Sequence, residues 1–273
     1  MLKYTLQRIL YMFIVFMIIT LMCFVLIRML PLAPLPAGDP HTAIVEARRE
    51  AMGYNKPYLE QFWMFLKNIV TKFDWGVSDK LFLGREVVDI FTQRLPATVI
   101  VNLYSIIFAI PIGIALGVFA ALKKNTWVDY LISTLTMVVI SVPSFVYAFL
   151  IQYIFSYKLG WLPFLMKSGT DWFSPAMFVS MLPAIMSLAF GTIAGFTRTT
   201  RAELTEVLTS EFMLLARTKG LTKAQATVRH ALRNCFVVVV PAIIGEFVSI
   251  LGGSLIIERI FSIPGVGRLT IDA

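Results

Sequence analysis

Long uncharged runs alternate with short polar segments along the whole chain. A helix needs about 20 apolar residues to cross a bilayer, and runs of about this length or longer lie at 9–27, 97–122, 130–157, 172–197 and 236–257. Apolar side chains follow one another continuously within each run, whereas barrel strands alternate apolar and polar positions. The pattern predicts an all-α polytopic membrane protein with five spans.

The polar segment 198–234 lies between the last two spans, and its own pattern is helical. An apolar stripe recurs at helical spacing on its first half: Leu204, Val207, Leu208, Phe212 and Leu215. Gly220 is expected to end this helix, because glycine adopts the left-handed C-terminal conformation without a Cβ clash. Thr222-Lys-Ala-Gln225 fits a capping box, so a second helix should follow. Its buried side is expected to hold Val228, Ala231, Leu232 and Cys235.

The residues 31–94 form the longest polar segment. Prolines between Pro31 and Pro40 prevent a regular helix, and helical periodicity returns at 42–52 and 58–73. Basic and acidic residues nearly balance here. We expect a compact extracytoplasmic cap between the first span, within 1–30, and the transmembrane core, 95–273; the alternative is a docking surface for a partner.

Charge adds an orientation to the predicted spans. The chain has 273 residues, of which 15% are charged, and a net charge of +8; soluble domains carry about 25% charged residues. Lys3 and Arg8 precede the first span, and the segment 198–234 is basic, so the positive-inside rule places both in the cytoplasm. Basic residues adjoin spans instead of interleaving with aromatic residues on a soluble face, and we expect no nucleic acid as a partner.

Several spans contain residues that disturb an apolar helix. Pro143, between Ser141 and Ser144, should kink the third span, either for packing or to line a pathway. Glu246 is an acid inside the last span, and such residues face a cavity or partner unless they are hydrated structural acids near a membrane surface. Gly245, Gly252 and Gly253 predict close packing of this span. The candidates for lining a pathway are Asn102, Ser141, Pro143, Gln152 and Glu246.

Catalytic and metal-binding motifs are missing from the sequence. There is no Gly-x-x-x-x-Gly-Lys-Ser/Thr loop for nucleotide phosphates and no Gly-x-Ser-x-Gly elbow. His41 and His230 lack the partners of a metal site, and Cys23 and Cys235 read as small buried apolar residues. We therefore predict no catalytic residue, metal or cofactor in this chain, and an intramembrane enzyme is the distant alternative.

Six short motifs, spread over nearly the whole chain, resemble those of one transporter family. They are Ala216-Arg-Thr-Lys-Gly220-Leu, Arg229-His-Ala-Leu-Arg-Asn234, Gly38-Asp-Pro40, Asp74-Trp-Gly-Val-Ser78, Gln93-Arg-Leu-Pro-Ala-Thr98 and Glu258-Arg-Ile-Phe-Ser-Ile-Pro-Gly-Val-Gly267. Together they resemble ABC importer permeases of the oligopeptide/dipeptide/nickel branch, and in particular the first permease subunit of a peptide importer. Leu214 and Leu215 replace the glutamate and first alanine of the superfamily's loop signature, a departure that is usual for this branch.

The resemblance implies a type I ABC importer transmembrane domain in a bacterial or archaeal cell (inner) membrane. The implied partners are a second homologous permease subunit, two cytoplasmic ATPase subunits that bind ATP and Mg, and an extracytoplasmic peptide-binding protein. The family has six spans, the last after the Ser-Ile-Pro-Gly-Val-Gly segment, so we expect the natural protein to continue past Ala273.

The resemblance also implies a function for the loop. Its first helix would sit in a cleft of an ATPase subunit and transmit the closure of that subunit to the pore. The residues expected to couple are Glu211, Ala216, Arg217, Lys219, Gly220 and Leu221. Short peptides are the expected cargo; nickel chelates or another small solute, or a membrane subunit that does not transport, are the alternatives.

Overall fold

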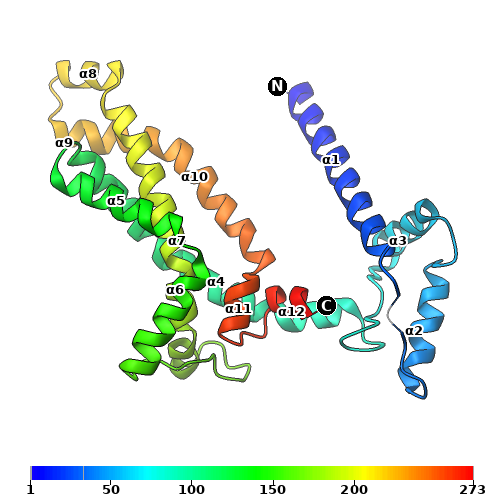
Figure 1. Cartoon of the computed structure of the whole chain (residues 1–273). Helices are drawn as coiled ribbons and strands as arrows, with labels where there is room; N and C mark the ends of the chain where they lie inside the picture. Colours follow the sequence, from blue (N-terminus) through cyan, green and yellow to red (C-terminus); the bar gives the residue numbers. More distant parts are fainter. Residues whose placement is uncertain (1, 33, 273) are drawn as a thin grey trace. The chain divides into compact units, whose positions relative to one another are not determined.

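The computed structural model describes residues 2–32 and 34–272, and these are almost entirely helical (Figure 1). An isolated bridge between Val77 and Glu86 is the one trace of strand pairing in the described chain. The predicted all-α class is confirmed. The chain forms two compact units, one up to Gln93 and the other from Arg94 to Asp272, and each is described separately.

The first unit contains three helices. They are α1 (Leu2–Arg28), α2 (Pro40–Ala51) and α3 (Tyr58–Lys72). The described residues of the proline-rich segment before α2 carry no helix, as predicted, and Asp39 caps α2 by accepting a hydrogen bond from the His41 N–H at 2.8 Å. Phe24 of α1 packs edge-on against Phe62 of α3. Cys23 is exposed on α1, so the prediction that it is buried is wrong; aliphatic and aromatic side chains of α1 are exposed on nearly every side.

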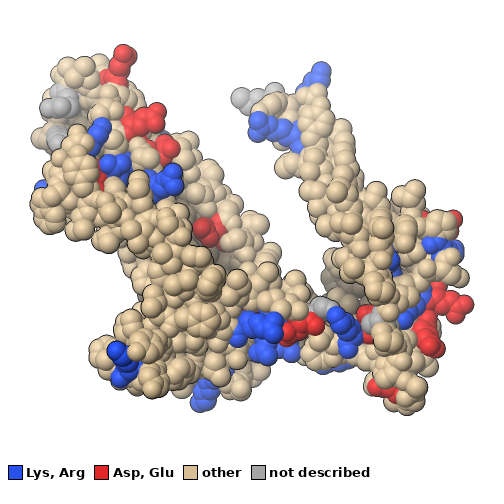
Figure 2. Space-filling view, in the orientation of Figure 1, with Lys and Arg blue, Asp and Glu red and all other residues tan. Residues whose placement is uncertain are grey.

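The second unit holds the remaining helices, several of them interrupted. They are α4 (Val87–Leu122, which begins in the first unit), α5 (Trp127–Ser141), α6 (Ser144–Ile151), the π-helix η1 (Gln152–Lys158), α7 (Pro175–Leu208), α8 (Glu211–Thr218), α9 (Lys223–Ala226), the π-helix η2 (Thr227–Ala231), α10 (Leu232–Ser249), the 3₁₀-helix η3 (Ile250–Gly252), α11 (Leu255–Ile260) and α12 (Val266–Asp272). Charged side chains gather toward the two ends of this unit, and the surface between them is almost entirely uncharged (Figure 2).

Four helices of the described chain are long and apolar enough to cross a membrane. They cover 3–28, 87–122, 175–208 and 224–252. A fifth candidate is the pair 127–141 and 144–158, whose halves are bent by 98° at the Val142–Pro143 junction. Proline has no N–H to donate and therefore interrupts the helix, so the kink predicted at Pro143 is confirmed as a break.

The carbonyls next to this break have hydrogen-bond partners of their own. The Ser141 hydroxyl donates to the Met137 carbonyl and the Tyr147 hydroxyl donates to the Val139 carbonyl, both at 2.8 Å. Tyr147 also lies against the ring of Phe190 on α7, with 5.2 Å between ring centroids. The Tyr147 hydroxyl thus replaces the N–H that Pro143 cannot offer to the Val139 carbonyl.

The α4 and α7 helices approach closely through two glycines on α4. A Cβ atom on Gly117 would lie 2.7 Å from the Thr197 carbonyl oxygen, and one on Gly113 would lie 2.8 Å from that of Ile193. The Thr197 hydroxyl donates to the Gly113 carbonyl across the same contact, at 3.2 Å. Small residues permit such backbone contact between membrane helices.

Of the three glycines predicted to pack closely in the last span, Gly253 alone does so, since a Cβ there would stand 2.6 Å from the Glu258 carboxylate. Gly245 and Gly252 have no atom within 4 Å of where a Cβ would stand, and only 17% of the apolar window of this helix is buried. Within the described chain, α10 packs along α7 and the turns that adjoin α10 itself, which leaves most of its circumference uncovered.

Candidate functional site

The segment 198–234 is not the separate helical hairpin that the apolar stripe predicted. The α7 helix continues to Leu208, breaks at Thr209 and Ser210, and is followed by α8, a helix of 8 residues. The first half of the predicted hairpin is therefore the end of a membrane-length helix plus a short second helix. Leu204, near the end of α7, is fully buried.

The break also changes which residues of α8 face inward. Met213 and Ala216 are 4% and 7% exposed, and they belong to one apolar cluster with Leu204 of α7 and Ala226 of α9. Phe212 and Leu215, predicted on the buried stripe, are exposed. A helix has 3.6 residues per turn, and two non-helical residues shift that phase.

A glycine turn and a capping box follow α8. Gly220 has a φ of +87° and open space where a Cβ would stand, and the Leu221 N–H donates to the Ala216 carbonyl at 3.3 Å. The predicted capping box is confirmed, since the Thr222 N–H donates to the Gln225 side chain at 3.1 Å and the Gln225 N–H donates to the Thr222 hydroxyl at 3.3 Å. The end of α8 is therefore fixed by a backbone hydrogen bond, and the start of α9 by hydrogen bonds between backbone N–H groups and the Thr222 and Gln225 side chains.

The second helix of the segment also departs from its predicted pattern. Ala231 and Cys235 are buried as expected, but Val228 is exposed, and Ala226 and Thr227 are buried before it. The wider turn of the π-helix η2 changes the facing of the residues around it. The second helix still has one buried side, which packs into the same apolar cluster as Met213 and Ala216 of α8.

The residues predicted for coupling divide into two sets. Ala216 points into the cluster and Leu221 is half-buried against it. Glu211, Lys219 and Gly220 are exposed; the side chain of Arg217 lies outside what the structure describes. Beside them α8 exposes three large apolar side chains that the sequence analysis did not assign to coupling, namely Phe212, Leu214 and Leu215. Charged residues surround this end of the unit (Figure 2), so α8 presents an apolar patch within a polar surface.

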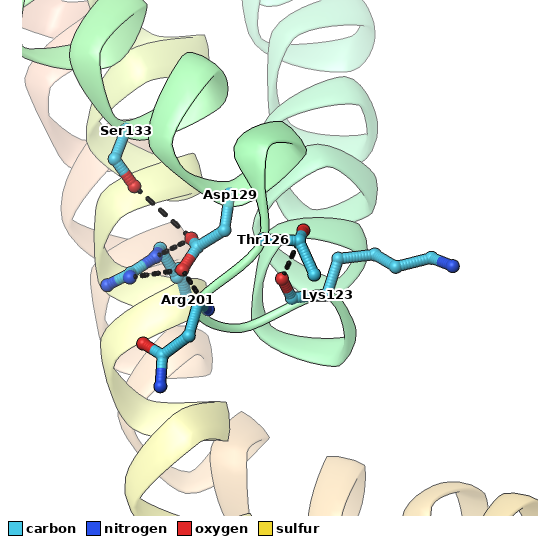
Figure 3. Close-up of polar contacts among 6 residues, drawn as sticks. Lys123, Thr126, Asp129, Ser133 and Arg201 are labelled. Atoms are coloured by element: carbon cyan, nitrogen blue, oxygen red, sulfur yellow. Dashed lines mark hydrogen bonds and ion pairs between the residues drawn. The ribbon is translucent and has the colours of Figure 1, made fainter.

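An ion pair between a buried Asp129 and a half-buried Arg201 was not predicted. Asp129, in the first turn of α5, is fully buried, and Arg201 of α7 donates from Nε and Nη2 to its two carboxylate oxygens at 2.5 and 2.8 Å (Figure 3). Asp129 also accepts the Asn125 N–H at 3.0 Å. The position of Asp129 at the edge of an apolar run could have suggested that its carboxylate needs a partner. Nothing in the sequence spacing between Asp129 and Arg201 identified Arg201 as that partner.

A second buried acid, Glu258 of α11, was also missed. It is 2% exposed and accepts hydrogen bonds from the Thr98 hydroxyl at 2.8 Å and the Arg268 N–H at 2.9 Å. A Cβ on Gly253 would stand 2.6 Å from its carboxylate. The glycines that follow Glu258 in the sequence were the available signal, because glycine permits backbone to approach a side chain closely.

The predicted pathway residues do not form one cluster of mutual contacts. Side-chain hydrogen bonds of Asn102, Ser141 and Gln152 go to carbonyl groups of Thr98, Met137 and Phe164. Ser141 and Pro143 lie together at the break, Pro143 is exposed, and Glu246 is half-buried on α10. Their part in a pathway stays a prediction.

Metal ligands do not gather anywhere in the described chain, where no group of three or more His, Cys, Asp or Glu side chains could hold an ion. His41 and His230 are both exposed. The α8 helix has the features of a contact surface, because it exposes an apolar patch on one side while Met213 and Ala216 pack into the apolar cluster on the other.

Comparison with known proteins identifies the family. The model of the "Binding-protein-dependent transport system inner membrane component" family matches residues 113–273, and the N-terminal model of the same transport-system membrane component matches residues 1–102. The "Glutathione transport system permease protein GsiC" of Escherichia coli strain K12 is 33% identical over 276 residues, covering 100% of this chain and 87% of that protein. The proteins of the same name from Escherichia coli O1:K1 and Shigella boydii serotype 4 match equally well.

This family consists of membrane permeases and not of enzymes. The family description implies an inner-membrane location, a substrate-binding protein and ATPase partners, which use ATP and Mg. Every helix long and apolar enough to cross a membrane overlaps the residues that the two family models match. The chain therefore belongs to the binding-protein-dependent transport system inner membrane components and is an ABC importer permease of the peptide/nickel branch.

Proposed function

We propose that this chain is a pore-forming subunit of an importer for short peptides, and that α8 is the helix through which separate ATPase subunits drive it. The observation that carries the proposal is the structure of α8. Its buried side is anchored by Met213 and Ala216, while Phe212, Leu214 and Leu215 are exposed. Contiguous exposed apolar residues with a polar surround mark protein contact sites.

The anchoring of α8 suits the transmission of force. Because Met213 and Ala216 share one cluster with Leu204 and Ala226, a partner that moves α8 also moves the end of α7 and the helix α9. In this proposal Glu211, Arg217, Lys219, Gly220 and Leu221 surround the contact. The basic residues favour the cytoplasmic side of the membrane, and the N-terminus lies on that side too.

A second permease subunit is the proposed neighbour of the uncovered membrane helices. The apolar window of α1 has no buried residue, and that of α10 is 17% buried. Two permease subunits would enclose a pathway to which Asn102, Ser141, Pro143, Gln152 and Glu246 contribute. An extracytoplasmic binding protein delivers the cargo to the outer face, where the cap predicted at residues 31–94 would lie.

Short peptides are the proposed cargo because the relatives are named for glutathione, which is itself a tripeptide. The test is uptake by proteoliposomes that contain the complete importer and its binding protein. Glutathione, dipeptides, longer peptides and nickel chelates are offered separately. ATP-dependent uptake of peptides supports the proposal, whereas uptake of nickel chelates alone, or of none of these, contradicts the proposed cargo.

The contact through α8 has its own test. Leu215→Asp places a charge in the middle of the exposed patch, so the ATPase subunits should no longer co-purify with the permease. Val70→Asp is the matched control, because Val70 is equally apolar and is exposed on α3. Retention of the ATPase subunits by Leu215→Asp would exclude this surface as their contact.

A further inference from the structure

The Asp129 carboxylate joins three parts of the permease at one point. It accepts two hydrogen bonds from Arg201 of α7, one from the Asn125 N–H in the turn between α4 and α5, and one from the Ser133 hydroxyl on α5 at 3.4 Å (Figure 3). The two Arg201 bonds form a bidentate fork, which fixes orientation as well as distance. The start of α5 is therefore held at a fixed distance and orientation relative to α7, so that a movement of α7 also moves it.

On the α7 side, the link to α8 is short and rigid. The helix continues without interruption from Arg201 to Leu208, a distance of about 10 Å at the rise of an α-helix. Leu204 lies on this stretch and packs in the same cluster as Met213 and Ala216 of α8. Next to Arg201, the close approach at Gly117 holds α7 against α4. A displacement of α8 thus reaches Arg201 through packed helix.

On the other side of the ion pair, α5 connects Asp129 to the bend at Val142 and Pro143. From Asp129 the helix runs unbroken to Ser141, and the chain then bends by 98° at Val142 and Pro143. A rigid helix that is displaced at its Asp129 end and meets a break at its other end converts that displacement into a change of angle at the break. Hinges of this kind absorb domain and helix motions in other proteins.

We propose that Asp129 and Arg201 are positioning residues that carry a movement of α8 to the break between α5 and α6. The inference rests on the proposed function of α8. A purely structural ion pair would support folding and assembly but would leave the yield of transport per ATP unchanged. A pair that transmits movement would change this yield in complexes that are assembled and still hydrolyse ATP.

The variants that separate the two roles are Asp129→Asn, Arg201→Lys and the double variant of Asp129→Asn with Arg201→Gln. Arg201→Lys keeps the charge but loses the fork geometry. The double variant removes both charges together and leaves no unpaired buried charge, so it is expected to assemble. Lys123→Gln is the control, since Lys123 is exposed in the adjoining turn and its side chain points away from the pair (Figure 3).

The measurement is the number of glutathione or dipeptide molecules imported per ATP hydrolysed, in proteoliposomes with the complete importer and its binding protein. We expect the assembled pair variants to hydrolyse ATP while this ratio falls at least about fivefold, the lower end of typical coupling between sites. The control should keep the wild-type ratio.

Two results would overturn the inference alone: a wild-type ratio in the assembled double variant, or failure of that variant to assemble, which would make the pair a folding element. A wild-type complex that hydrolyses ATP without any uptake would instead overturn the proposed function, and this inference with it. The wild-type measurement therefore distinguishes the two failures.

Discussion

At the scale of single residues, the Glu258 carboxylate joins segments that are far apart in the sequence. Thr98 at the start of the transmembrane core donates to Glu258 and in turn accepts the Val266 N–H at 2.8 Å. The backbone N–H of Arg268 donates to the other carboxylate oxygen. The loop around Glu258 is thus held to α4 by buried hydrogen bonds, and a buried donor left without a partner costs about 1–3 kcal/mol.

Replacing Glu258 by leucine should destabilise the protein strongly. Glu258→Leu leaves the Thr98 hydroxyl and the Arg268 N–H without their acceptor, so we expect the free energy of unfolding to fall by about 2–5 kcal/mol. A lower midpoint of thermal unfolding of the purified complex would show this loss. Glu46→Gln on an exposed face of α2 should have no effect; equal midpoints for both variants would contradict the argument.

Gly220 offers a second test at this scale. Its φ of +87° is costly for a residue with a Cβ, so Gly220→Val should distort the turn between α8 and α9. We expect ATP hydrolysis to continue while uptake per ATP falls, with the assembled complex intact on a sizing column. Wild-type uptake per ATP would show that the turn geometry is not needed for coupling.

Of three acids within or beside the apolar runs, the sequence pattern predicts a role for only one. Glu246 was selected because it interrupts an apolar run, yet it is only half-buried. Asp129 and Glu258 are the buried ones, and their partners Arg201 and Thr98 come from distant helices. A partner supplied by tertiary packing has no fixed spacing in the sequence, so only the structure could show it.

At the scale of elements, the sequence correctly predicts caps and breaks that depend on neighbouring residues. It does not predict which side chains of α8 and of the helix after it are buried. The capping box at Thr222 and the break at Pro143 depend on neighbouring residues alone, and the structure has both. The predicted stripe through Phe212 assumed one regular helix. The break after Leu208 and the π-helix η2 altered the helical phase, and neither has a distinctive residue that signals it.

The contact between α4 and α7 gives a prediction about element packing. Gly117→Ala places a Cβ 2.7 Å from the Thr197 carbonyl and should force the helices apart, with a loss of stability of about 1–3 kcal/mol as for other overpacked sites. Gly191→Ala is the control, since Gly191 lies in α7 with open space around it. If the midpoint of thermal unfolding of Gly117→Ala equals or exceeds that of Gly191→Ala, the two helices can accommodate the extra methyl group and the prediction is wrong.

At the scale of the whole molecule, the proposed orientation assigns α8 and α3 to opposite sides of the membrane. In a variant without Cys23 and Cys235, Thr218→Cys should resist a membrane-impermeant maleimide added to intact cells. Lys67→Cys should be labelled, because both positions are exposed in the structure. Labelling of Thr218→Cys from outside would reverse the orientation and remove α8 from the reach of the ATPase subunits.

The bend at Val142 and Pro143 has a consequence for how easily this span can change shape. Hydrocarbon offers no water to a carbonyl that loses its partner, so most interruptions of a membrane helix depend on neighbours to solvate them. Here the Val139 carbonyl faces the missing N–H of Pro143, and the Tyr147 hydroxyl of α6 donates to it across the break at 2.8 Å. This hydrogen bond ties the two arms of the bend together, so a change in their angle would cost a hydrogen bond in the lipid interior unless another donor reached the Val139 carbonyl.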